Sequence, residues 1–260
     1  MEIKLDKLSY KDSLKNISYE FAEEKITSII GASGSGKSLL GYLICGIEKS
    51  YSGNLINEYQ GREIGYVFQN PEESFIFDTV REELSFGLKK YNYKLDVLNK
   101  RIEDALKMVE LPVSYLDKSP FELSSGEKKL VSIATILSLN PSLIILDDPT
   151  MGLDNEREEK LIKLLKKLKT RYHKTIIIMS SDIQFVLKLT DNYLLLKKGK
   201  IISLGNKKDL LSNGDKIKRA GIEIPKIIDF INTVKKKKDI NLELTFDIKE
   251  LMKDVYRNVR

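Results

Sequence analysis

The chain has few of the residues that several common classes of protein require. Its 260 residues include one cysteine, one histidine, no tryptophan, 15 glycines and 6 prolines. A single cysteine, Cys45, excludes an intrachain disulfide and a cysteine-cluster metal site, and we expect it to fill core space. With 42% hydrophobic and 32% charged residues, the chain is neither collagen-like nor largely disordered. We expect a soluble globular protein that buries a sizeable core.

Long hydrophobic runs are also missing. The longest apolar stretches, around residues 130–137 and 175–179, fall short of the roughly 18 apolar residues that a membrane-spanning helix needs. The first ten residues, MEIKLDKLSY, contain acids and lack the apolar centre of a signal peptide. We therefore expect no membrane span, no secretion signal and a location inside the cell.

Positive charge is unevenly distributed. The net charge is +6, from 44 Lys and Arg against 38 Asp and Glu. Residues 207–260 hold 14 Lys and Arg against 9 Asp and Glu, so most of the excess lies in the tail. A basic tail is compatible with nucleic-acid binding through phosphate contacts.

The spacing of apolar and turn residues predicts an α/β chain without internal repeats. Continuous apolar runs, as in Ser142–Leu146, indicate strands covered on both faces, which is typical of a parallel sheet. Beyond Gly205 we expect helical patches, with Lys235–Lys238 as an exposed link. The predicted strands are Glu2–Leu8, Leu14–Phe21, Lys25–Ile30, Arg62–Val67, Ser142–Leu146, Thr175–Met179, Tyr193–Lys197 and Lys200–Leu204, and the predicted helices are Lys37–Cys45, Tyr91–Val109, Ser125–Leu137, Asn155–Lys169 and Ile183–Leu189.

A glycine-rich loop carries the most specific chemical motif. Gly31-Ala-Ser-Gly-Ser-Gly-Lys37-Ser38 fits G-x-x-x-x-G-K-[ST] between a predicted buried strand and a predicted helix. In such a loop backbone N–H groups surround phosphate, and the helix N-terminus adds a favourable dipole. We expect Lys37 to reach the β- and γ-phosphates and Ser38 to bind Mg²⁺.

Two acids follow a buried strand, where a phosphate loop needs a carboxylate for its metal. The apolar run Leu143–Leu146 ends at Asp147 and Asp148. We expect Asp147 to hold Mg²⁺ through water and Asp148 to polarise the attacking water.

A five-residue segment before that strand gives the motifs a family context. Leu123-Ser124-Ser125-Gly126-Glu127 resembles the LSGGQ signature of ATP-binding cassette (ABC) proteins. Tyr10 then matches the aromatic residue that stacks on adenine, Gln69 matches the Q-loop glutamine, and Met151–Asp154 matches the D-loop. The resemblance covers about residues 2–215 and implies an α/β phosphate-loop NTPase core with a parallel sheet, an N-terminal antiparallel β-subdomain, an α-helical signature subdomain and a small C-terminal extension.

The resemblance also implies domain bounds, cofactors and site residues. The ATPase domain would span 1–215, its helical subdomain about 70–137, and a dimerisation extension 216–260. ATP and Mg²⁺ would be the cofactors. Catalytic roles would fall to Asp148, Gln69 and Ser181, metal binding to Ser38, Gln69 and Asp147, and nucleotide binding to Tyr10, Gly31, Ala32, Ser33, Gly34, Ser35, Gly36, Lys37, Ser38, Leu39, Ser124, Ser125, Gly126, Glu127 and Asp154.

Residues 68–87 carry a narrower resemblance. The segment beginning Phe68-Gln69-Asn70-Pro71 and ending Phe86-Gly87 resembles the FQNP…TV.E…FG stretch of energy-coupling factor (ECF) transporter ATPases, which drive uptake of vitamins and transition-metal ions. The resemblance implies a paired second ATPase, an integral membrane coupling subunit, a membrane substrate-binding subunit and a peripheral location on the cytoplasmic face of the membrane. Arginine-bearing coupling helices would meet an acidic patch of Glu72, Glu73, Asp78, Glu82 and Glu83.

Three departures from the family pattern affect the expected chemistry. Asp148 stands where members usually have Glu, Ser181 stands where they usually have a γ-phosphate-sensing His, and the signature reads LSSGE. The sole histidine, His173, precedes the relevant strand, and we expect it in an exposed loop. In cassette dimers nucleotide lies between the phosphate loop of one subunit and the signature of the other. We therefore expect this chain's own site to bind ATP but hydrolyse it slowly, which favours a heterodimer.

Other classes stay open at this point. The basic tail would suit a soluble cassette ATPase acting on nucleic acid or ribosomes. However, only 87 residues separate Lys37 from Ser124, too few for the coiled coil of DNA-repair cassettes, and translation-associated cassettes carry two cassettes in one chain. A different cassette importer and a phosphate-loop kinase are further alternatives. We favour the ECF-type importer without a nucleic-acid partner, and the sequence leaves its cargo open.

Overall fold

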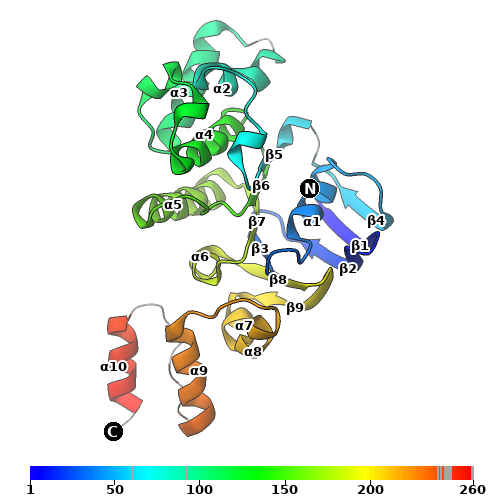
Figure 1. The fold of residues 1–260 in the computed structure, drawn as a ribbon, viewed down its shortest axis with the longest axis vertical. Coiled ribbons are helices and arrows are strands. Elements are labelled where there is room, and N and C mark those ends of the chain that lie inside the picture. The colour runs from blue at the N-terminus through cyan, green and yellow to red at the C-terminus, as the bar shows by residue number, and fades with distance from the viewer. Residues whose placement is uncertain (60, 92, 239, 241, 243–247, 259–260) are drawn as a thin grey trace.

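The central element is a mixed sheet in the strand order β5-β6-β7-β3-β8-β9. The structure is a computed structural model that describes residues 1–59, 61–91, 93–238, 240, 242 and 248–258. Strands β5, β6, β7, β3 and β8 run parallel to one another, and β9 runs antiparallel to β8. The predicted parallel sheet is confirmed (Figure 1). The bounds are β3 Ile26–Ile30, β5 Ile64–Val67, β6 Leu143–Asp147, β7 Thr175–Ser180, β8 Asn192–Lys197 and β9 Lys200–Asn206.

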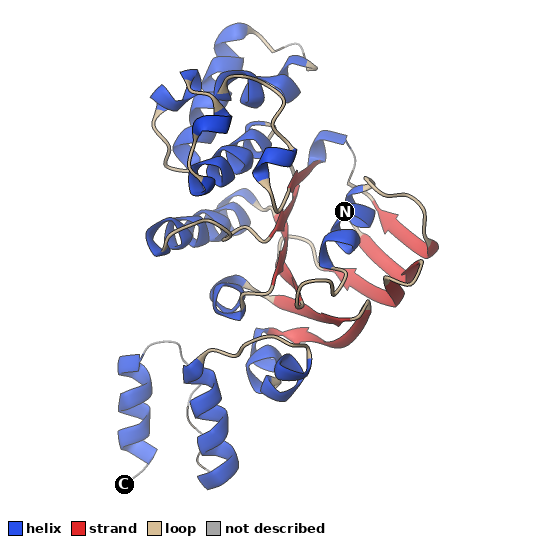
Figure 2. Ribbon diagram, viewed as in Figure 1, coloured by secondary structure: helices blue, strands red, loops and turns tan. Residues whose placement is uncertain are grey.

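Each central strand is apolar along its whole length because its two faces enter different cores. In β6, Leu143 and Ile145 pack with the N-terminal sheet, whereas Ile144 and Leu146 pack with the helices on the other side. Those covering helices include α5 (Asn155–Tyr172) and α6 (Ile183–Leu189), which lie across the central sheet from the N-terminal strands (Figure 2). Alternate residues thus point to opposite faces, and both faces are buried.

A second sheet, in the order β2-β1-β4, is antiparallel throughout. It consists of β1 (Ile3–Tyr10), β2 (Leu14–Phe21) and β4 (Ser52–Asn57), and α1 (Lys37–Cys45) shares its core. The sequence did not predict β4. Its six residues are exposed or only half-buried, so the strand carries no alternation of apolar and polar residues that could reveal it.

The signature segment belongs to a helical part at one end of the molecule (Figure 1). This part contains α2 (Val80–Lys89), α3 (Leu95–Met108) and α4 (Ser125–Ser138). The predicted helix from Tyr91 begins only at Leu95. Short 3-10 helices occupy Gly61–Glu63, Pro71–Glu73, Val113–Asp117 and Pro120–Glu122.

Helices α7 (Lys207–Ser212), α8 (Gly214–Arg219), α9 (Lys226–Lys238) and α10 (Ile248–Asn258) form the opposite end of the molecule. The prediction that Lys235–Lys238 is a link is wrong, because these lysines form the last turn of α9. Lysine is a good helix former and suits a helix C-terminus, where positive charge meets the negative end of the dipole.

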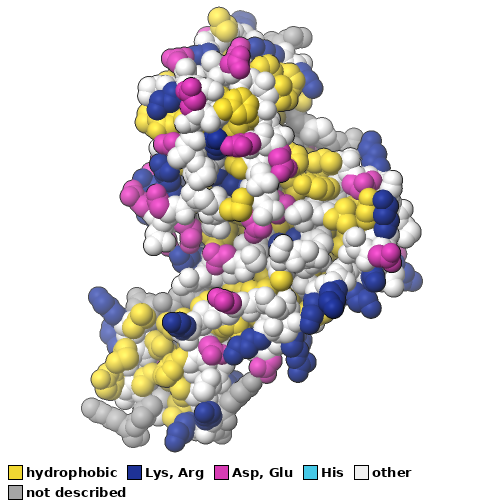
Figure 3. All heavy atoms as spheres, in the orientation of Figure 1, with side chains coloured by type: hydrophobic (Ala, Val, Ile, Leu, Met, Phe, Trp, Pro, Cys, Tyr) yellow, Lys and Arg dark blue, Asp and Glu magenta, His cyan; other side chains and the backbone are white. Residues whose placement is uncertain are grey.

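The C-terminal helices bury one apolar face and expose another. Leu251 of α10 shares a small apolar core with Ile231 of α9. In contrast, Ile248, Met252 and Tyr256 are 70%, 46% and 68% exposed, and hydrophobic side chains gather over this region (Figure 3). None of the helices in the described ranges has the length and apolarity of a membrane span.

Candidate active site

The phosphate loop lies between β3 and α1, in the context that its motif predicts. Gly34 and Gly36 have φ angles of 73° and 104°, in the left-handed region that favours glycine. A Cβ atom on Gly36 would also lie 2.8 Å from a methyl group of Leu14. The loop therefore requires glycine at these turns, and its backbone passes directly into the N-terminus of α1.

Lys37 occupies the base of the loop. Its side chain is buried, and Nζ donates to the carbonyl oxygens of Gly31 and Ala32 at 2.8 and 3.3 Å. An open cavity of about 820 Å³ lies in front of it. The residues that line this cavity are Asp12, Ser13, Lys15, Ser33, Gly34, Gly36, Lys37, Ser38, Leu39, Gln69, Asp148, Thr150, Met151, Ser180, Ser181, Asp182 and Lys198.

Asp147 ends β6 as a buried carboxylate beside the loop. Its Oδ2 accepts a hydrogen bond from the Tyr66 hydroxyl at 3.2 Å, and its Oδ1 is buried without a hydrogen-bond partner among the described residues. Burial raises the pKa of Asp147 above its ordinary value, and the nearby Ser38 hydroxyl opposes this shift only in part. A buried carboxylate with an unused oxygen, beside a hydroxyl group, fits a Mg²⁺ ion and its water ligands.

The metal would need ligands from outside the chain. No group of three or more His, Cys, Asp or Glu side chains in the described part of the chain could hold a metal ion. Mg²⁺ commonly keeps waters and binds substrate phosphates with only one or two carboxylates. The residues present therefore suit a Mg²⁺ ion that arrives with a nucleotide.

The three predicted catalytic residues line the same cavity. Asp148 follows Asp147 with a φ angle of 39°, and its N–H donates to the Met179 carbonyl oxygen at 2.9 Å. That bond holds the end of β6 beside the segment that leads to Ser181, while Gln69 comes from the loop after β5. His173 is exposed after α5, with Nδ1 2.8 Å from a carboxylate oxygen of Glu24. The catalytic roles themselves stay predictions.

The signature lies away from this cavity. Ser124 begins α4 as its N-cap in a capping box with Glu127. Residues 124–127 are absent from the cavity lining, whereas Ser125 lines a separate cavity of about 350 Å³ with Gln69's neighbours Asn70–Glu73 and with Met151 and Gly152. Tyr10 does not line the nucleotide cavity either. The Tyr10 hydroxyl donates to a carboxylate oxygen of Glu48 at 3.0 Å. Tyr10 stands two residues before Asp12, which does line the cavity.

Glu127 faces its own chain. Its carboxylate accepts hydrogen bonds from the Tyr115 hydroxyl at 2.8 Å and from the Ser124 hydroxyl at 2.8 Å, and it lies 3.5 Å from the Arg157 guanidinium. The hydrogen bond from Tyr115, followed by that from the Ser124 backbone, lowers the pKa of Glu127. In this arrangement Ser124 is engaged by Glu127, so a phosphate that bound Ser124 would have to compete with this carboxylate.

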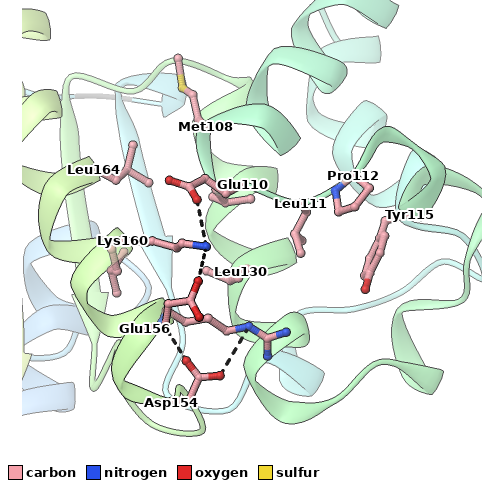
Figure 4. Close-up of a pocket in the computed structure, with 13 residues that line it drawn as sticks. Met108, Glu110, Leu111, Pro112, Tyr115, Leu130, Asp154, Glu156, Lys160 and Leu164 are labelled. Atoms are coloured by element: carbon pink, nitrogen blue, oxygen red, sulfur yellow. Dashed lines mark hydrogen bonds and ion pairs between the residues drawn. The ribbon is translucent and has the colours of Figure 1, made fainter.

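The signature also packs against the D-loop. A Cβ atom on Gly126 would lie 2.8 Å from the Gly152 carbonyl oxygen, and Asp154 caps α5 by accepting from the Arg157 N–H at 2.8 Å. Beside them lies a cavity of about 300 Å³ between the helical part and α5. Lys160 spans its rim between Glu110 and Glu156 (Figure 4). These contacts join the signature and D-loop within one chain.

Sequence reasoning missed cavity residues that tertiary contacts bring to the phosphate loop. The β8–β9 turn lies against it, since the Gly199 N–H donates to the Ser35 carbonyl oxygen at 3.0 Å and the Lys15 N–H donates to the Gly199 carbonyl oxygen at 2.8 Å. Lys15 and Lys198 thereby reach the cavity. No local motif marks either lysine, so only the fold reveals them.

The acidic patch is smaller than predicted. Glu83 is 5% exposed and accepts hydrogen bonds from the backbone N–H groups of Ile76 and Phe77. It is therefore not available to a docking partner, which corrects the prediction. Glu72, Glu73, Asp78 and Glu82 are exposed.

Replacement of Glu83 by Ala is expected to lower the free energy of unfolding by about 2 kcal/mol, because two N–H groups lose a charged acceptor. Urea unfolding of the full chain measures this change. Glu82→Ala, at the exposed neighbour, is expected to cost less than about 1 kcal/mol. Equal losses in the two variants would contradict a special role for the buried carboxylate.

The site defines a phosphate-loop ATPase, and comparisons with known proteins give its family. The model for the ABC transporter family matches residues 14–151, and a model for an AAA domain matches the shorter segment 117–187. A Staphylococcus aureus protein named energy-coupling factor transporter ATP-binding protein EcfA1 is 34% identical over 223 residues, covering 82% of each chain. The Clostridium tetani protein of that description named EcfA2 is 32% identical and covers 99% of this chain and 97% of its own.

A solved structure agrees with these relatives. The cbiO1 protein of Clostridium perfringens, described as part of the ABC transporter complex cbiONQ, superimposes with a TM-score of 0.73 at 31% identity, covering 88% of this chain and 97% of its own. The chain is an ABC-type ATPase. More narrowly, it belongs to the family of energy-coupling factor transporter ATP-binding proteins.

Proposed function

We propose that this chain is an ATPase subunit of an ECF-type importer and couples ATP binding and hydrolysis to uptake of vitamins or transition-metal ions. The observation that carries the proposal is the position of the exposed acids Glu72, Glu73 and Asp78. They follow Gln69, which lines the nucleotide cavity. A membrane subunit bound to these acids would therefore contact the chain only a few residues after Gln69, which lines the nucleotide cavity.

Charge favours an arginine-bearing partner at this surface. Arginine pairs with carboxylates through two parallel hydrogen bonds, and complementary charge selects partners and speeds their association. Glu72 already pairs with Lys128 of α4, so a partner's arginine at this position would also act on the signature helix. We place the subunit peripherally on the cytoplasmic face of the membrane, with cargo chosen by a separate membrane substrate-binding subunit.

Pairing with a second ATPase follows from the placement of the signature. Ser124 and Gly126 lie outside this chain's own nucleotide cavity, so they would act on nucleotide bound by another subunit. The exposed apolar residues Ile248, Met252 and Tyr256 of α10 support pairing through the C-terminal extension, since contiguous exposed apolar surface marks interaction sites.

The proposed partner is a related ATPase, which makes the pair a heterodimer. Asp148 and Ser181 line the cavity where family members usually have Glu and His. Two copies of this site would hydrolyse ATP slowly. A partner with the usual residues would supply the faster site, and the signature of this chain would complete it.

Copurification with a related ATPase and a membrane coupling subunit tests the proposal. We expect the complex to hydrolyse ATP faster than the isolated chain. Charge reversal by Glu73→Lys with Asp78→Lys is expected to reduce recovery of the membrane subunit about tenfold, as like charges oppose binding. Glu20→Lys, on the exposed face of β2, is the matched control. Equal recovery with all variants, or copurification of nucleic acid in place of a membrane subunit, would contradict the proposal.

A further inference from the structure

Lys129 is a buried charge next to the nucleotide site. It lies on α4, five residues after Ser124, and its side chain is 0% exposed. Its Nζ donates to the carbonyl oxygens of Phe68 and Gln69 at 3.0 and 2.6 Å. These carbonyls belong to the loop that follows β5, so a single ammonium group joins the signature helix to that loop.

The surroundings of Lys129 show why an apolar residue would not be equivalent. The helical part already has an extensive apolar core, and burial of an ammonium group costs free energy unless it is paired. Desolvation lowers the pKa of Lys129 to about 8, while the nearby carboxylates of Asp147 and Asp148 raise it. The cation therefore lies among the two acids of the site and the backbone of the loop that bears Gln69.

We propose that Lys129 is a positioning residue for the nucleotide site: its ammonium group fixes the backbone of Gln69 and so transmits the orientation of α4 to the Gln69 side chain. This inference rests on the proposed role of Gln69 at the Mg²⁺ ion and does not depend on any transporter partner. Two directed hydrogen bonds define the loop position more narrowly than apolar packing would. A rotation of α4 would consequently displace Gln69 in the cavity.

Amide hydrogen exchange of the full, nucleotide-free chain tests the hold on the loop without requiring activity. Lys129→Met removes the ammonium group but keeps an apolar stem. We expect exchange in residues 68–75 to become about tenfold faster, because local opening costs less free energy, while amides of β6 and β7 keep their protection. Lys129→Arg, which retains charge and donors, should restore slow exchange. Lys107→Met, at an exposed lysine of α3 that pairs with Glu103 of the same helix, is the control and should leave the segment unchanged.

The coupling to Gln69 is tested by measuring the affinity for a fluorescent ATP analogue at increasing Mg²⁺ concentration. The quantity compared is the Mg²⁺ concentration at which the gain in affinity is half-maximal. Lys129→Met is expected to raise this Mg²⁺ concentration about tenfold. In a Gln69→Ala background the same substitution should raise it little further, since the effects of two substitutions are not additive when one residue acts through the other. Without Mg²⁺, the affinity of Lys129→Met for the analogue should stay within about twofold of that of the unsubstituted chain.

The outcomes separate the inference from its premise. Unchanged exchange in residues 68–75, faster exchange throughout the chain, or failure of Lys129→Arg to restore protection would overturn the positioning role. A full tenfold effect of Lys129→Met in the Gln69→Ala background would also overturn it. If Gln69→Ala alone leaves the Mg²⁺ requirement unchanged while the exchange results hold, the proposed metal role of Gln69 is wrong, and Lys129 positions the loop only.

Discussion

Substitution of Lys37 by Met is expected to weaken ATP binding roughly 10²- to 10³-fold, because truncation of one partner of a buried, hydrogen-bonded charge pair costs roughly 2–5 kcal/mol. In the structure Nζ of Lys37 is buried at the base of the loop and donates to Gly31 and Ala32. These carbonyl oxygens hold the ammonium group near the position that phosphate would occupy. Without it, the β- and γ-phosphates would lose the cation that reaches them, and only backbone N–H groups and the helix dipole would remain.

The measurement is the Kd of a fluorescent ATP analogue for the full chain with Mg²⁺ present. Lys25→Met is the matched control, because Lys25 is exposed just before β3, at the other end of that strand from the loop. Unfolding in urea checks that both variants remain folded. Retention of affinity within about threefold in folded Lys37→Met would contradict the assignment of this cavity to nucleotide phosphates.

The fold was largely predictable because its strands are buried on both faces. Runs such as Ile144–Leu146 have no polar residue, which is typical of the covered strands of a parallel sheet. Strand β4 and the contact between Gly199 and Ser35 were not predictable from local pattern. An exposed edge strand has no apolar period, and a contact between distant turns has no local signature at all.

The site was predictable where a motif fixes both residue type and backbone. The phosphate loop is such a case, since its glycines adopt φ angles that other residues rarely do. Glu83 and Lys129 show the limit. Both lie in helical phase with an apolar residue, Glu83 with Val80 and Lys129 with Ile133, so helix phase would have indicated burial. Residue type alone led to the prediction that Glu83 belongs to an exposed acidic patch, and no prediction was made for Lys129.

Replacement of Asp148 by Glu is expected to raise ATP turnover by this chain's own site about 10- to 100-fold, because a displacement of about 1 Å at a reacting group can change rates by that order. Asp148 lines the nucleotide cavity, and its backbone is fixed by the bond from its N–H to the Met179 carbonyl oxygen. The added methylene would therefore extend the carboxylate into the cavity without moving its anchor. ATP affinity should change little, since Lys37 and the loop hold the phosphates.

Single-turnover hydrolysis by the full chain with Mg²⁺ measures this step apart from nucleotide release. Ser181→His, on the facing segment of the same cavity, is expected to increase turnover further only when Glu is present at 148, since a γ-phosphate contact helps when the attacking water is oriented. Asp117→Glu makes the same chemical change at an exposed acid that pairs with Arg81 and does not line the nucleotide cavity. It should have no effect on turnover. A decrease in turnover with Asp148→Glu would show that this site is adapted to aspartate, and the expectation of a slow site with a faster partner would then be wrong.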